Sequence, residues 1–280
     1  MSHPVSRLRA RCTTIRCRLA SAPVLRLALL LLALGPGLGP TPVRAQSEEG
    51  AFVAAAADLK FALAEVAAAF QRETRSALRI TYGSSGNFAQ QIRNGAPFEL
   101  FLSADERYVE DLARDGMLRD VGTVYAIGRI ALYAPRGSPV VVDPSLAGLA
   151  GAVDAGRVRR FAIANPEHAP YGRAAREALL HAGLWTAIER SLVLGENAAQ
   201  AMQFAADSDG GIVPYALALN PAAAKDGNVA LLPDTWHAPL RQRMALTRRA
   251  GPVASRFYAF MQTPSAGEIL ARHGFALPKP

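Results

Sequence analysis

Short apolar runs alternate with helical patterns along most of this chain. Residues 52–57 (FVAAAA) are small and apolar, which is typical of a strand buried on both faces of a parallel sheet. In residues 58–73 the apolar side chains recur every three or four positions, so an amphipathic helix is predicted there. Two more strand and helix pairs follow, with strands over 78–82 and 99–103 and helices over 88–93 and about 106–114.

The same alternation continues after Gly128 and predicts a second unit of this kind. Strands are expected over 129–135, 161–165, 192–195, 210–215 and 243–249, and helices over 171–184, 196–207 and about 264–272. The stretch 220–239 is rich in glycine and proline and is expected to be a loop. Strands that alternate with helices favour an α/β fold in which each unit is a mostly parallel sheet flanked by helices.

The first 45 residues differ from the rest of the chain. A basic region precedes an apolar core at 25–35, and Val-Arg-Ala stands before Gln46. This pattern is typical of a secretory signal peptide, so we expect cleavage after Ala45 and a periplasmic protein. The apolar core is short for a membrane span, and a retained anchor is the alternative. Since Cys12 and Cys17 precede this core, the exported protein has no cysteine.

The positive charge of the chain is concentrated in the same segment. The formal net charge is +8, but without the seven arginines of residues 1–45, 24 basic residues stand against 23 acidic ones. A nearly neutral exported protein lacks the basic surface that a nucleic acid requires, so no nucleic-acid partner is expected.

Four predicted junctions between a strand and a helix are unusually small, polar or rich in glycine. They are residues 56–60, 82–87, 165–172 and 194–200, two in each unit. Ligands of open α/β sheets bind beyond the carboxyl ends of the strands, where the helices begin. Helix starts offer unpaired N–H groups and a positive potential, and serine hydroxyls add neutral donors, so these junctions favour a compact anion.

Simpler explanations apply to each feature taken alone. The small polar residues of 82–87 (YGSSGN) suit helix capping, and Tyr171 suits a half-buried core position. His168 has no second histidine at ligand spacing, so a surface or loop role is favoured over metal binding. Residues 207–211 (DSDGG) lack the other ligands of a calcium loop. No P-loop, dinucleotide-binding or zinc-protease motif occurs after Ala45, so we expect no enzyme and no cofactor.

Several motifs together resemble the molybdate-binding periplasmic proteins of ABC transporters, over essentially the whole chain after the signal peptide. They are GSSG, QIRNGAPF and SAD in the first unit, and NPEHAPYG and LGEN in the second. The resemblance implies a type II periplasmic binding-protein fold, with the ligand cleft between two lobes. The first lobe would comprise residues 46–128 and 244–280 and the second 129–243, with crossings near 128–134 and 243–248.

The resemblance also implies the residues that contact the anion. They come from the end of the first strand, the serine turn, the APYG turn, the backbone after GEN and the GIVPY segment: Asp58, Ser84, Ser85, Tyr171, Ala198 and Tyr215. A tyrosine that many family members have falls on Pro214 in this chain. Whether Tyr215, one residue later, replaces it is open at this point.

Asp58 departs from the family, in which serine, threonine or asparagine often stands at this position. An ionised carboxylate has no proton to donate, and at ~4 Å it repels an anion by on the order of 4 kcal/mol. Three explanations are open. The carboxylate caps its own helix, it accepts a proton from a protonated oxyanion, or the ligand is a cation. The cap is ordinary helix chemistry and is the favoured explanation.

The resemblance implies a solute-binding protein of an ABC importer. It would capture molybdate or tungstate by lobe closure and deliver the anion to a membrane permease with its ATPase, as a monomer that binds no metal cation directly. Alternatives with the same fold bind a phosphate- or arsenate-like anion or a ferric species, although Tyr82, Tyr171 and Tyr215 are too scattered for a typical ferric site. A remote alternative is an exported hydrolase that uses Ser85 with His168.

Overall fold

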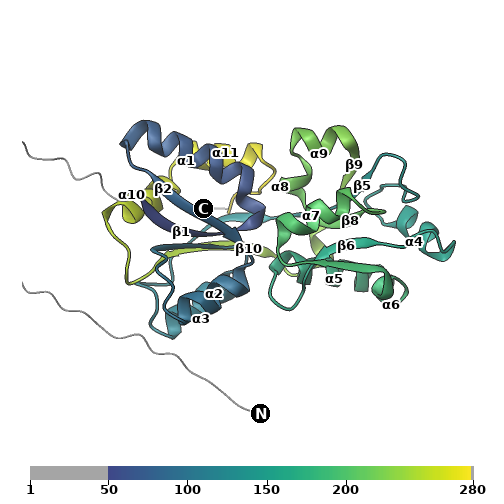
Figure 1. The fold of residues 1–280 in the computed structure, drawn as a ribbon, viewed down its shortest axis with the longest axis horizontal. Helices are drawn as coiled ribbons and strands as arrows, with labels where there is room; N and C mark the ends of the chain where they lie inside the picture. The colour runs from purple at the N-terminus through teal and green to yellow at the C-terminus, as the bar shows by residue number, and fades with distance from the viewer. Residues whose placement is uncertain (1–49, 279–280) are drawn as a thin grey trace, which may run out of the picture. The chain divides into compact units, whose positions relative to one another are not determined.

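The computed structural model describes residues 50–278, so the expected signal peptide lies outside the described residues. In this range the strands form two five-stranded sheets, in the orders β2-β1-β3-β10-β4 and β7-β6-β8-β5-β9 (Figure 1). We call the first sheet with its helices lobe 1 and the second sheet with its helices lobe 2. None of the helices of residues 50–278 is long and apolar enough to cross a membrane.

Lobe 1 is built from both ends of the described chain. Its strands are β1 (Ala51–Ala56), β2 (Leu78–Gly83), β3 (Leu100–Ser103), β4 (Thr123–Gly128) and β10 (Leu240–Leu246). Its helices are the short 3₁₀ helix η1 (Ala57–Leu59), α1 (Lys60–Thr74), α2 (Ser85–Arg93), α3 (Glu106–Arg114), α10 (Pro252–Phe260) and α11 (Pro264–Arg272).

Lobe 2 is formed by the middle of the chain. Its strands are β5 (Ile130–Pro135), β6 (Phe161–Ala164), β7 (Leu192–Gly195), β8 (Gly211–Pro214) and β9 (Gly227–Leu231). Its helices are α4 (Ala147–Asp154), α5 (Pro170–His181), α6 (Trp185–Ile188), η2 (Glu189–Ser191), α7 (Ala198–Ala206), α8 (Tyr215–Ala218), α9 (Pro221–Asp226) and η3 (Asp234–Trp236).

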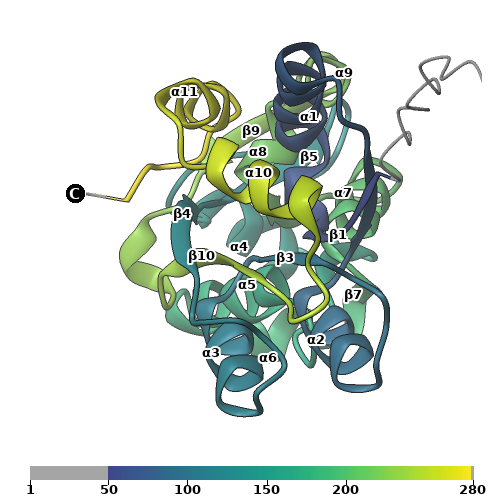
Figure 2. The ribbon, with the colours of Figure 1, turned by 90° about the vertical axis from the view of Figure 1, so that its left-hand side faces the viewer.

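Helices cover both faces of the lobe 1 sheet, as Figures 1 and 2 show. On one face α1, α10 and α11 pack on the strands, and the rings of Phe70 and Phe257 meet edge to face with centroids 5.0 Å apart. On the other face α2 and α3 bury Phe88 against Phe98. Strand β1 lies between these two layers, which explains why its sequence is apolar throughout instead of alternating.

Each sheet is mostly parallel, with one reversed strand. In lobe 1, β10 runs antiparallel to its neighbours β3 and β4, and in lobe 2, β5 runs antiparallel to β8 and β9. Both reversed strands follow a crossing from the other lobe. Only Arg129 separates β4 from β5, and residues 232–239 lead back from β9 to β10. These two segments are the covalent connections between the lobes.

The second crossing lies earlier in the chain than the sequence suggested. The expected loop at 220–239 contains α9 and β9, and the last strand begins at Leu240 instead of residue 243. Residues 240–243 therefore belong to the lobe 1 sheet, where they pair with β4. Exposed Arg241 stands between buried Leu240 and Gln242, so charged and polar residues concealed the strand.

Glycine at position 172 lets α5 approach the end of β6. A Cβ atom placed on Gly172 would lie 2.1 Å from the carbonyl oxygen of Ala164. Real Cβ atoms do not tolerate such a distance, so any larger residue must push the first turn of α5 away from the sheet. That turn carries Tyr171 into the space between the lobes.

We predict that Gly172→Ala lowers the free energy of unfolding by about 1–3 kcal/mol, because the added methyl group overlaps the backbone of β6. Urea unfolding followed by circular dichroism measures this change. Gly151→Ala is the matched control, since Gly151 also lies in a helix but has open space around its Cβ position. The control should gain about 0.5–1 kcal/mol from better helix propensity. Equal effects of both substitutions would contradict the packing explanation.

Candidate functional site

A small pocket lies where the two lobes meet. It is lined by residues 56–58, 83–85 and 104 of lobe 1 and by residues 169–171 and 198 of lobe 2, and its volume is about 10 Å³. The lobe 1 residues follow the carboxyl ends of β1, β2 and β3, and the lobe 2 residues stand at the starts of α5 and α7. All four junctions singled out in the sequence therefore contribute to one place. No lysine or arginine lines this pocket.

Ser85 is a buried donor at the start of α2. Its side chain has no exposed surface, and its Oγ accepts a hydrogen bond from the Ala104 N–H at 2.9 Å. Because the oxygen is held by this N–H, the hydroxyl proton can point to an acceptor in the pocket. Ser85 therefore offers a neutral, preoriented donor.

Ser84 has a different role from its neighbour. Its Oγ accepts from the Asn87 N–H at 3.3 Å and so caps α2, which confirms the capping explanation for this serine. The same oxygen lies 3.0 Å from Nδ1 of His168 in lobe 2. Ser84 lines the pocket, but its hydrogen bonds are committed to the helix and to the opposite lobe.

The glycines beside these serines permit close approach. A Cβ at Gly83 would lie 2.8 Å from the ring of Phe88, and one at Gly86 would lie 2.7 Å from the His168 carbonyl oxygen. The Gly86 N–H donates to that carbonyl at 3.0 Å, across the boundary between the lobes. Neither glycine has a left-handed backbone. The GSSG turn therefore places two hydroxyls where backbone from the other lobe comes into contact.

The carboxyl group of Asp58 does not cap a helix, so the favoured explanation for this residue is wrong. Neither η1 nor α1 has a side-chain cap, and Asp58 is only 1% exposed. Its Oδ2 instead accepts hydrogen bonds from the Tyr171 hydroxyl at 2.9 Å and from Nε2 of Gln242. Its Oδ1 is buried and has no hydrogen-bond partner among the described residues. A carboxyl group thus lies between the lobes, with one oxygen satisfied and the other not.

Burial governs the ionisation of this group. Removal from water raises the pKa of Asp58 from 3.8 to about 6, although the hydrogen bonds from Gln242 and Tyr171 oppose the rise. Burial, reinforced by the neighbouring Asp58, also raises the pKa of Tyr171 well above its usual value, so that the phenol stays protonated. At neutral pH the Asp58 carboxylate is therefore the acceptor and the Tyr171 phenol the donor of their hydrogen bond.

Two residues that the sequence did not reveal complete this network. Gln242 of β10 donates to both Asp58 and the Tyr171 oxygen, the latter at 3.1 Å, and its Oε1 accepts from the Tyr125 hydroxyl at 2.8 Å. Gln242 is fully buried and lies 184 positions from Asp58 in the chain. A buried glutamine between two arginines is the one signal that could have marked it, and it requires the strand to be recognised first.

Backbone at the start of α7 provides another donor. Asn197 caps this helix by accepting from the N–H groups of Ala199 and Gln200. The N–H of Ala198, which lines the pocket, lies outside that cap. A helix N-terminus with an uncapped N–H is a favourable position for an anion.

Tyr215 is not brought to the pocket. It begins α8, where the guanidinium of Arg129 stacks over its ring at 4.9 Å and its backbone N–H donates to the Arg129 carbonyl. Pro214 pairs with Ile130 in the sheet. Tyr215 therefore lies beside the first connection between the lobes, and it does not replace the missing tyrosine of the family within the pocket.

His168 bridges the lobes instead of forming a catalytic group with Ser85. Its Nδ1 meets Ser84, and its Nε2 lies 3.5 Å from a carboxylate oxygen of Glu196. Ser84 is 4% exposed, and its Oγ already accepts the capping N–H of Asn87, so this serine is committed to the helix. Within residues 50–278, no group of three or more His, Cys, Asp or Glu side chains could hold a metal ion.

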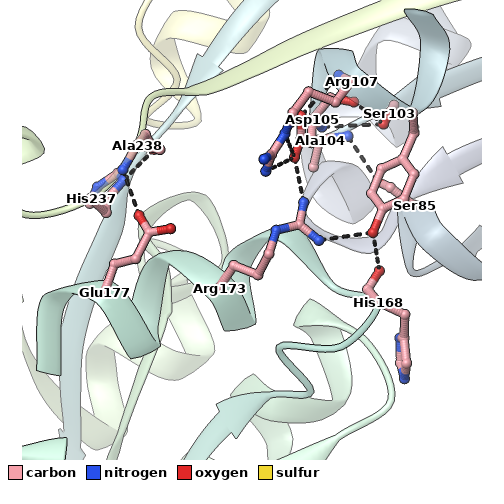
Figure 3. Close-up of polar contacts among 11 residues, drawn as sticks. Ser85, Ser103, Ala104, Asp105, Arg107, His168, Arg173, Glu177, His237 and Ala238 are labelled. Carbon is pink, nitrogen blue, oxygen red and sulfur yellow. Dashed lines mark hydrogen bonds and ion pairs between the residues drawn. The ribbon is translucent and has the colours of Figure 1, made fainter. Parts of the chain in front are cut away.

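Further contacts between the lobes flank the pocket. Figure 3 shows Arg173 reaching from α5 in lobe 2 to Asp105 at the start of α3 in lobe 1. Nη1 of Arg173 also donates to the Tyr108 hydroxyl at 2.8 Å. Near the second crossing, the Ala238 N–H donates to Glu177 at 2.6 Å. These pairs hold the lobes together on one side of the pocket.

Comparison with known proteins gives a consistent set of relatives. Residues 51–276 match the model of a family described as bacterial extracellular solute-binding protein. A molybdate-binding protein of Azotobacter vinelandii is 32% identical over 262 residues, which cover 90% of this chain and 98% of that protein. One from Rhodobacter capsulatus is also 32% identical, over 75% of this chain and 82% of its own length.

A solved structure gives the same result for the fold. The periplasmic molybdate-binding protein of Azotobacter vinelandii matches with a TM-score of 0.75 and 32% identity, covering 82% of this chain and 100% of that one. Sequence and fold therefore point to the same group of proteins.

We predict that Asp58→Asn stabilises the protein at neutral pH. Since folding raises the pKa of Asp58 from 3.8 to about 6, its contribution to stability is complete below pH 3.8 and is lost as the pH rises through 6. The free energy of unfolding of the variant relative to wild type should therefore grow by about 3 kcal/mol across this window. Urea unfolding at several pH values measures the difference. Asp154→Asn, at an exposed aspartate, is the control and should show no such trend.

Proposed function

This chain belongs to the family of bacterial extracellular solute-binding proteins, and from this premise we propose that it captures a tetrahedral oxyanion, molybdate or tungstate. It then delivers the anion to the membrane permease of an ABC importer with its ATPase. The solved relative bears out the expected two-lobe type II binding-protein fold. The N-terminal segment directs export to the periplasm, where the protein acts as a monomer.

The observation that carries this proposal is the donor set of the pocket. The Ser85 hydroxyl, the Ala198 N–H and the starts of α2, α5 and α7 converge on one buried place, and no lysine or arginine lines it. Neutral donors and helix termini stabilise an anion after it has lost its water. A buried cation would instead attract any acidic group strongly, so it would discriminate less between anions. These donors suit a small oxyanion with acceptors on every side.

The choice of molybdate as the ligand rests on the similar proteins. Two proteins that are 32% identical to this chain bear the name molybdate-binding protein. Molybdate and tungstate have the same charge and nearly the same size, so one pocket of this kind accepts both. The pocket as it stands is smaller than either anion, because about 10 Å³ corresponds to roughly one water molecule. Binding therefore requires the lobes to part and to close again around the anion.

The connections between the lobes suit such a movement. Only Arg129 and residues 232–239 join the two sheets covalently. The other contacts between the lobes are side-chain pairs, a few backbone hydrogen bonds and the apolar packing of small residues such as Ala56, Ala57 and Ala104 against lobe 2. Closure brings Gly86 against His168 and Asp105 against Arg173. Ligand capture in this mechanism involves no covalent chemistry.

Asp58 favours a second ligand class. A carboxylate lining an anion pocket accepts a proton from hydrogen phosphate or hydrogen arsenate, and such ligands carry one. A ferric species has no comparable support, since Tyr171 donates to Asp58 and Tyr215 lies outside the pocket. A ligand panel of molybdate, tungstate, sulfate, phosphate, arsenate and ferric citrate separates these possibilities.

We predict that micromolar molybdate or tungstate raises the thermal midpoint of the protein from Gln46 onward, because a ligand that binds only the folded state stabilises it. Ser85→Ala should weaken binding by about 10- to 100-fold, the effect of losing one hydrogen bond to a charged group. A thermal melt measures the midpoint, and calorimetric titration measures the affinity.

Ser138→Ala is the matched control. Like Ser85, Ser138 accepts a backbone N–H, from Val140 at 3.0 Å, but it does not line the pocket. It should bind as tightly as wild type. If the protein binds phosphate or arsenate but not molybdate or tungstate, the proposed ligand is wrong and the proposed class of protein stands. If it binds no oxyanion, the proposed function is wrong.

A further inference from the structure

Asp58 combines two properties that are rarely found together at an anion site. The residue is 1% exposed and lines the pocket, yet its Oδ1 has no hydrogen-bond partner. Buried polar atoms without a partner are uncommon, because the loss of water is not compensated. Only one other described side chain, Arg243 at its Nε, has such an atom. The unsatisfied oxygen therefore points to a ligand or to a proton.

We propose that Asp58 determines the specificity of this site by taking up one proton when the oxyanion binds, so that the anion is captured together with a proton. This inference rests on the proposed function. The proton comes from the solvent, or from the ligand where that is a hydrogen oxyanion, and it resides on Oδ1. The resulting O–H then donates to an oxygen of the anion.

The hydrogen bonds around Asp58 direct the proton to this oxygen. Tyr171 and Gln242 both donate to Oδ2. A proton on Oδ2 would compete with these two donors, whereas Oδ1 accepts no hydrogen bond that a proton would displace. The backbone N–H groups of Asp58 and Leu59 lie near the carboxyl group and lower its pKa, but burial has the larger effect. The protonated side chain is then a neutral donor with nearly the shape of asparagine. It supplies the hydrogen bond that an ionised carboxylate cannot give, and it removes the repulsion between two anions.

No cation opposes this protonation. Asp58 takes part in no ion pair among the described residues, and the groups that bond to it from α5 and β10 are a phenol and an amide. Strand β4 adds the Tyr125 phenol, whose pKa burial and Asp58 together raise well above its usual value. Burial likewise raises the pKa of Asp58 to about 6, close enough to neutrality for a bound anion to shift the equilibrium.

The other elements packed against η1 add little charge near the carboxyl group. Helix α7 has no titratable side chain, and α8 contributes only Tyr215. The remaining titratable residues of β2 and α1 are Arg79, Tyr82, Lys60, Glu65, Arg72 and Glu73, and all of them except Tyr82 are exposed. His168 is the other titratable residue next to the pocket, where it contacts Ser84 and Glu196. Any test must therefore separate Asp58 from His168.

Calorimetric titration with tungstate between pH 6.5 and 8.5, in two buffers of different ionisation enthalpy, tests the proposal. The wild-type dissociation constant should rise about tenfold per pH unit, with one proton taken up per anion. Asp58→Asn should bind at least as tightly at pH 8.5 as wild type does at pH 6.5, with no pH dependence and no proton uptake. His168→Gln should keep the wild-type slope.

Each result of these titrations supports or overturns proton uptake by Asp58. A wild-type dissociation constant that does not change with pH would overturn the proposal. The same holds if Asp58→Asn keeps the pH dependence of wild type. In that case, loss of the pH dependence in His168→Gln would show that the histidine is responsible. If Asp58→Asn fails to fold, infrared difference spectra of wild type still apply, and a carboxylic-acid band must appear on adding tungstate. Failure of wild type and every variant to bind any tetrahedral oxyanion would reject the proposed function itself, whereas tight binding that is independent of pH would reject only this inference.

Discussion

Two lobes meet around a carboxyl group that has been removed from water. The Tyr171 hydroxyl crosses from lobe 2 to bond Asp58 in lobe 1, and Gln242 bonds the same oxygen from the strand that returns to lobe 1. All three side chains are buried, so their protonation states and hydrogen bonds are coupled to the closeness of the lobes. A dehydrated anion placed here is surrounded by neutral donors and by one acidic group, Asp58. The Asp58 carboxyl group must be protonated, because its negative charge would otherwise keep the anion out.

The chain path explains how such a place arises. Parallel strands end at the same edge of each sheet, and the helices that follow them begin there. Because β5 and β10 each enter the opposite sheet as its one reversed strand, the two edges face each other across short connections. The pocket consequently needs no large side chains. Serine hydroxyls, alanine N–H groups and close backbone contacts at Gly86 and Gly172 are sufficient, and each of these positions was already unusual in the sequence.

Local patterns predicted most elements and four of the junctions that form the pocket, because apolar periodicity and small polar turns depend on neighbours in the chain. They did not predict β4, α4 or α10, and they failed again where the structure depends on distant partners. Strand β9 was concealed by its glycine- and proline-rich surroundings, and β10 by Arg241 and Gln242, although its alternate residues are buried. Capping by Asp58 was a sound local expectation, but Tyr171 and Gln242 lie 113 and 184 positions away and bond the carboxylate instead. Tyr215 was assigned to the anion site because it lies beside a family motif, but its ring stacks against the guanidinium of Arg129 instead.

A crystal structure grown with tungstate, with the metal located by its anomalous scattering, shows whether Asp58 bonds the captured anion. We expect one tungsten peak in the pocket between Ser85 and Ala198, with an anion oxygen about 2.5–2.7 Å from Oδ1 of Asp58, the distance of a hydrogen bond from an O–H to a charged oxygen. A peak held by arginine side chains elsewhere would show that the anion binds at another site. An anion in the pocket with Oδ1 turned away from it would show that Asp58 does not donate to the anion.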